Sequence, residues 1–79
     1  MSIKEIKELN ERKQALIEKL NGVMVAVHKT TAKILQASDN GDYDAAVGFM
    51  KTRTNLMNDV SKIEEDILKI INKVNAITI

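Results

Sequence analysis

The chain has 79 residues, with 12 basic and 11 acidic side chains and a formal net charge of +1. A domain this small buries only about 60% of the surface that its unfolded chain exposes, so its core alone gives limited stability. Cysteine is absent, which excludes disulfides and thiolate metal sites, and a single histidine, His28, cannot build a zinc site alone. We therefore expect no metal and no cofactor.

Basic and acidic residues are interspersed along the chain, and its only aromatic residues are Tyr43 and Phe49. Nucleic-acid binding needs a clustered basic surface, preferably with aromatic side chains that stack on bases. We therefore predict no nucleic-acid partner. RNA binding is an alternative, and it would give an affinity that falls steeply with salt. It would use Lys29, Lys33, Lys51 and Arg53.

No apolar run approaches the roughly 20 residues that a membrane-spanning helix needs. Residues 1–20 alternate charged side chains with isoleucine and leucine, which is unlike a signal peptide. We therefore expect no membrane association and a cytoplasmic location.

The first part of the chain predicts a helix from about Ile3 to Ala37. Ser2 followed by Glu5 is typical of a capping box, in which each side chain satisfies a backbone N–H of the first turn. Apolar residues then recur every three or four positions, as expected for one face of a helix. The inward positions are Ile6, Leu9, Lys13, Leu16, Leu20, Val23, Val27, Thr30, Ile34 and Ala37.

The apolar rhythm stops at residues 38–42, where we predict a turn. Gly41 can adopt the left-handed conformation that ends a helix, and Asp42 is placed to cap the next helix. Asp39 and Asn40 suit the bend because their side chains bond to nearby backbone. A calcium loop would need more oxygen ligands and a late glutamate, so the stretch indicates a structural turn and no metal site.

The same rhythm returns over a second helix predicted from about residue 43 to residue 76. Sustained heptads in two segments joined by a short turn are typical of helices packed at a shallow angle. The sequence therefore predicts one all-α domain, residues 1–79, folded as a long antiparallel helical hairpin. The inward positions of the second helix are Ala46, Phe49, Arg53, Leu56, Val60, Ile63, Ile67, Ile70, Val74 and Ile77.

Apolar residues also flank each seam at heptad position e. A contact between two helices does not need this many apolar residues. An isolated hairpin would leave them facing water, so we expect a second hairpin or a partner helix to complete a four-helix bundle. Methionine adapts to different partners, so the band serves either self-association or binding of a helix from another protein. The predicted partner-binding residues are Ile17, Met24, Met50, Met57 and Ile71, and Ile3 and Tyr43 also flank the seam.

Three polar residues interrupt the predicted seams: Lys13, Thr30 and Arg53. One interpretation is that the long basic side chains bury their stems and extend their charges outward. The other is that Arg53 and the threonine hydroxyls form a polar layer that fixes register. His28 lies at an outward-facing b position, and the sequence leaves its role open.

The chain contains none of the motifs that organise catalysis. It has no Gly-rich phosphate loop and no metal-ligand spacing, and a hairpin presents convex surfaces where catalysis needs a concave site. We therefore expect a non-enzymatic interaction protein with no small-molecule substrate.

The stretch from Ala32 to Ile67 resembles the helix, acidic glycine turn and helix of small flagellar and type III export chaperones of the FliT and FlgN kind. The residues that carry the resemblance are Gly41, Asp42, Ala45, Ala46, Lys51, Arg53 and Leu56. The resemblance implies a cytoplasmic bacterial chaperone that covers an amphipathic helix of an export substrate. The competing hypothesis is a self-assembling structural or regulatory coiled coil from a secretion apparatus, a phage or a host-factor inhibitor.

Overall fold

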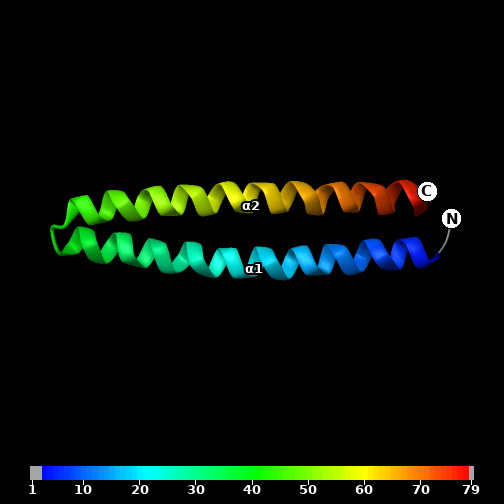
Figure 1. Ribbon diagram of the computed structural model, residues 1–79, viewed down its shortest axis with the longest axis horizontal. Coiled ribbons are helices and arrows are strands. Elements are labelled where there is room, and N and C mark those ends of the chain that lie inside the picture. Colours follow the sequence, from blue (N-terminus) through cyan, green and yellow to red (C-terminus); the bar gives the residue numbers. More distant parts are fainter. Residues whose placement is uncertain (1–2, 79) are drawn as a thin grey trace.

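The computed structural model describes residues 3–78 and contains two antiparallel helices packed along their whole length (Figure 1). Helix α1 spans Ile3–Asp39 and helix α2 spans Tyr43–Thr78. The hairpin measures 59 × 15 × 13 Å, and the described ends of the chain lie together opposite the turn. The predicted all-α helical hairpin is confirmed. The predicted capping box depends on Ser2, which lies outside the described residues.

Helix α1 ends two residues later than predicted because the turn is closed by backbone hydrogen bonds. The N–H of Gly41 donates to the carbonyl of Ser38 at 3.0 Å, and the N–H of Asp42 donates to that of Ala37 at 2.9 Å. With Gly41 at a φ of 75°, these two bonds form a Schellman motif, which keeps Ser38 in the helix. Helix α2 likewise extends to Thr78, beyond the predicted end near residue 76.

Asp42 starts helix α2 directly from this motif. Its carboxylate Oδ1 accepts a hydrogen bond from the N–H of Ala45 at 3.1 Å, and its carbonyl accepts the N–H of Ala46 at 3.1 Å. The first bond is the N-cap interaction predicted for Asp42. Because the same residue closes one helix and opens the next, the turn leaves α2 little freedom to rotate relative to α1.

Replacing Gly41 by alanine is expected to lower the free energy of unfolding by about 1–2 kcal/mol, because a Cβ is unfavourable at positive φ. Apart from Gly41 and its two chain neighbours, no residue has an atom within 4 Å of the place that this Cβ would take, so the loss would come from the backbone conformation alone. Urea denaturation followed by circular dichroism measures the change.

The matched controls are Gly22→Ala and Gly48→Ala, which change glycines inside the two helices. Neither added Cβ would meet an atom within 4 Å, so neither glycine allows a close helix approach within the hairpin. Each control is expected to stabilise the protein by up to about 1 kcal/mol. A stability gain from Gly41→Ala as well would contradict the role assigned to the turn.

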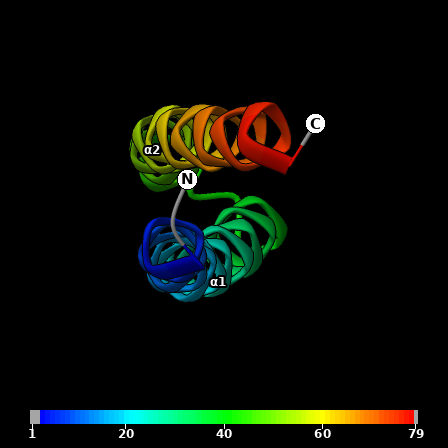
Figure 2. The same ribbon diagram turned by 90° about the vertical axis from the view of Figure 1, so that its right-hand side faces the viewer.

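The core is the predicted seam between the two helices. All ten inward positions of α1 are buried or half-buried, and so are nine of the ten in α2, with Arg53 exposed. Seen from the open end, α2 stays above α1 and the two helices are inclined in opposite directions, so their axes cross at an angle, as in a coiled-coil pair (Figure 2). Such coiling keeps a heptad seam in continuous contact. The buried apolar residues are Val27, Ala37, Ala46, Val60, Ile63 and Ile70.

Candidate functional site

The outer surface of the hairpin has two unlike sides, which the heptad positions define. If the seam residues occupy positions a and d, the e positions of both helices flank one side of the seam and the g positions flank the other. Contacts between the helices agree with this division. Arg53 bonds to Thr31 at an e position, whereas the Lys33 ammonium, at a g position, lies 5.8 Å from the ring centroid of Phe49.

One side, here called the apolar face, consists of the e positions and the neighbouring b positions of both helices. It holds seven of the eight large apolar residues that the structure shows as exposed, the exception being Val25 on the outer surface of α1. An apolar surface concentrated on one side of a small protein is typical of an interaction site. Its apolar residues are Ile3, Ile17, Met24, Leu35, Tyr43, Val47, Met50, Met57, Leu68 and Ile71.

The opposite side carries charges of both signs at the g and c positions. Its shallow hollows between the helices are lined by Lys19, Asp59 and Lys62 at one level and by Arg12, Lys69 and Lys73 at another, with Asp66 bordering both. Mixed exposed charge is what a solvated surface requires. The two sides therefore differ in character, and only one of them exposes extensive apolar area.

All five predicted partner-binding residues lie on the apolar face. Met50 and Ile71 are 53% and 44% exposed, while Ile17, Met24 and Met57 are half-buried against the seam. The structure thus brings the five to one side of the hairpin.

The b-position members of the face were not predicted. Leu35, Val47 and Leu68 are each at least half exposed and extend the face outward from the e positions. The signal was present in the sequence, because each of them lies three or four residues from an e position on the same helix surface. The b position usually faces solvent, so its residues are not ordinarily expected in a contact.

The predicted polar layer contains Arg53 and Thr31. The Nε–H of Arg53 donates to Oγ1 of Thr31 at 3.0 Å, and that hydroxyl donates to the carbonyl of Val27 at 3.0 Å. Thr30 does not join the layer. It is buried, and its hydroxyl donates to the carbonyl of Ala26 in its own helix at 2.8 Å. The bond to Thr31 places the Arg53 guanidinium at the edge of the apolar face.

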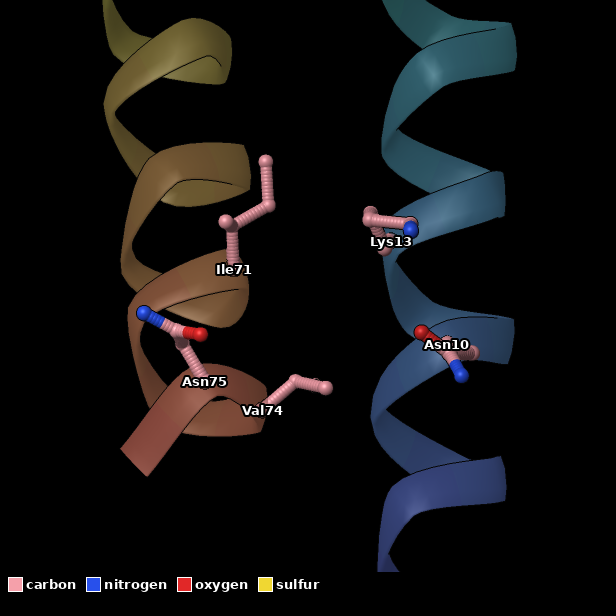
Figure 3. A pocket seen from close by; sticks show the side chains of 5 residues that line it. All are labelled: Asn10, Lys13, Ile71, Val74 and Asn75. Carbon is pink, nitrogen blue, oxygen red and sulfur yellow. The ribbon is translucent and has the colours of Figure 1, made fainter. Parts of the chain in front are cut away.

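Lys13 occupies its predicted seam position nearer the open end of the hairpin. Figure 3 shows Lys13 and Asn10 on α1 opposite Ile71 and Val74 on α2, around a hollow of about 190 Å³ that Asn75 also lines. Lys13 is half-buried, as expected when the stem of a lysine lies beside apolar side chains. This hollow adjoins the apolar face.

Within residues 3–78 no three histidine, cysteine or acidic side chains lie close enough together to hold a metal ion, and His28 is exposed on α1. Neither helix, over its described length, is apolar enough to cross a bilayer. Comparison with known protein families, curated proteins and solved structures finds no match. The apolar face is the feature of this surface that most needs a functional explanation.

Proposed function

We propose that this protein is a non-catalytic protein–protein interaction module that lays its apolar face against an amphipathic helix of another chain. The observation that carries the proposal is the concentration of seven exposed large apolar residues on one side of the hairpin. Two parallel rows of apolar side chains suit a helix that presents residues at i, i+3, i+4 and i+7. Covering this surface would remove apolar area from water, which favours association.

The composition of the apolar face supports a contact that can adjust to the shape of its partner. Met24, Met50 and Met57 each occupy an e position of this face, and their unbranched side chains can repack around different shapes. Few charges interrupt the face, which reduces the cost of removing it from water.

The resemblance of residues 32–67 to small export chaperones gives the proposal a specific form. In this form the protein is a cytoplasmic chaperone of the bacterial flagellar or type III export kind. It binds the amphipathic helix of an export substrate and keeps that helix from assembling early.

The second candidate function is self-assembly as a structural or regulatory coiled coil. It is favoured by the elongated shape, with a radius of gyration of 17.8 Å against about 12 Å for a compact domain of this length. In that case a further copy of the hairpin covers the apolar face.

Site-specific photocrosslinking in the native cell tests the proposal. A photoreactive amino acid replaces Leu68 on the apolar face in one strain and Asn55 on the charged side in the other. Both positions lie on α2 and are exposed, so a photoreactive side chain at either position can contact a bound protein. We expect Leu68 to give an abundant crosslink that mass spectrometry maps to an apolar helix surface of another protein, and Asn55 to give none.

Each other outcome counts against a stated part of the proposal. Crosslinks from Leu68 only to other copies of this chain would support self-assembly and contradict the chaperone form. Equal crosslinking from both positions, or none from Leu68, would contradict an interaction through the apolar face.

A further inference from the structure

Arg53 places a cation among the apolar side chains of α2. It lies at a seam position, and its neighbours on the helix surface at i−3 and i+4 are Met50 and Met57, both members of the apolar face. Its Nε–H donates to Oγ1 of Thr31 on α1 at 3.0 Å. The guanidinium therefore lies between the e positions of the two helices, where a helix bound to the apolar face would cover it.

Thr31 satisfies only part of the guanidinium. Arginine has N–H donors on all three of its side-chain nitrogens, and the bond to Thr31 uses the one on Nε. Within residues 3–78 the structure gives Arg53 no other hydrogen bond and no ion pair. Arg53 is exposed, so water can accept hydrogen bonds from the two terminal nitrogens while the face is open. A partner that covers the face would remove this water.

The apolar face has no carboxylate of its own near Arg53. Among its e and b positions within residues 3–78, the only acidic residue is Glu64. At 1.5 Å per residue, Glu64 lies about 16 Å further along α2. On α1 the ionisable residue beside Thr31 is His28, three positions earlier, and it carries no negative charge. The anion that pairs with Arg53 in a complex must therefore come from the partner.

Arg53 consequently restricts which helices can bind. Burying a guanidinium without an anion is costly, so an aliphatic side chain opposite Arg53 is disfavoured. An aspartate or glutamate in that place accepts two parallel hydrogen bonds from the terminal nitrogens, which match the spacing of the carboxylate oxygens. Met50 and Met57 border the guanidinium, and their unbranched side chains can move aside for the carboxylate.

We propose that Arg53 determines the specificity of the apolar face by pairing with an aspartate or glutamate that interrupts the apolar stripe of the partner helix. The inference rests on the proposed interaction function and narrows the class of helix that this function requires. Apolar side chains then supply most of the contact, while the single ion pair selects the partner and its register.

The yield of the Leu68 photocrosslink in the native cell gives the first test. The probe lies about 22 Å from Arg53 along α2, so it reports on binding and not on the local change. We expect Arg53→Glu to lower the yield at least about tenfold, because it places two carboxylates against each other. Arg53→Lys keeps the charge but loses the paired donors, so a smaller loss is expected.

The matched control is Lys51→Glu, which makes the same change in net charge at an exposed position on the outer surface of the same helix. It should keep the full Leu68 crosslink. Circular dichroism of the purified chains checks that Arg53→Glu and Lys51→Glu retain their helical content.

A second photoreactive position identifies the residues opposite Arg53. Thr54 is exposed at the b position next to Arg53. Mass spectrometry is expected to map its crosslink to a helix surface of another protein that carries an aspartate or glutamate within about one turn. Replacing that acidic residue by arginine in the partner should restore crosslinking to the Arg53→Glu chain and weaken it to the unchanged chain.

The outcomes separate this inference from the proposed function. A full Leu68 crosslink to another protein in the Arg53→Glu chain would overturn the role of Arg53 and leave the interaction function intact. The same holds if the segment opposite Thr54 has no acidic residue, or if Lys51→Glu causes an equal loss. Crosslinks from Thr54 to the region of Glu64 in another copy would overturn the partner named here and support self-assembly. Absence of any Leu68 crosslink from the unchanged chain would contradict the proposed function, and this inference with it.

Discussion

Replacing Met50 and Ile71 together by glutamate is expected to weaken association through the apolar face at least about a hundredfold while the hairpin stays helical. Both side chains are about half exposed, so the carboxylates can reach water when the face is open. In a complex they would be buried among apolar side chains. A hundredfold loss corresponds to about 2.7 kcal/mol, a modest cost for burying two unpaired charges.

The matched control introduces two carboxylates elsewhere on α2. Asn55 and Asn72 are exposed and lie outside the apolar face, so Asn55→Glu with Asn72→Glu changes the net charge equally. Sedimentation equilibrium and, once a partner is known, its binding affinity measure the effect. Equal losses in the two double variants would show that net charge, and not the apolar face, governs association.

Replacing Ile63 by alanine is expected to lower the free energy of unfolding by about 2–4 kcal/mol. Ile63 is 5% exposed and is one of only six buried apolar residues in the described chain. Small domains have total stabilities near the lower end of about 5–15 kcal/mol, so this one change would remove a large share. Thermal and urea denaturation would both show it.

Leu68→Ala serves as the control because Leu68 is on the same helix but 58% exposed. Its expected cost is below about 1 kcal/mol. Both changes are measured in the Met50→Glu, Ile71→Glu background, so that unfolding is not coupled to association. Similar losses for Ile63→Ala and Leu68→Ala would contradict the seam as the source of stability.

The fold was predictable from the sequence because two independent kinds of signal agree. The heptad pattern places residues such as Val27 and Val60 in the seam, and both are buried. The turn chemistry then sets the direction of the chain: Gly41 has positive φ and Asp42 caps α2, as expected from their residue types.

The remaining details depend on side-chain choices that spacing does not determine. Thr30 and Thr31 are equally able to accept a hydrogen bond from Arg53, and only the rotation of α1 decides for Thr31. The extent of the apolar face was underestimated because Leu35 and Leu68 sit at positions that ordinarily face solvent. The e-position residues of the face were identified because they directly flank the seam.

The antiparallel hairpin has a further consequence for the order in which it opens. Each turn of one helix contacts only the turns of the other helix that lie at a similar distance from Gly41. Contacts near Gly41 therefore join residues that are close in sequence, whereas contacts between the regions of Ile6 and Val74 close a long loop. Long loops cost more entropy to close, so refolding is expected to start at the turn and proceed towards the far end. Unfolding is expected to start at the end opposite the turn, so the amide hydrogens at that end would exchange fastest. A partner that binds the end opposite the turn would therefore stabilise the whole hairpin, because it would prevent the first step of unfolding.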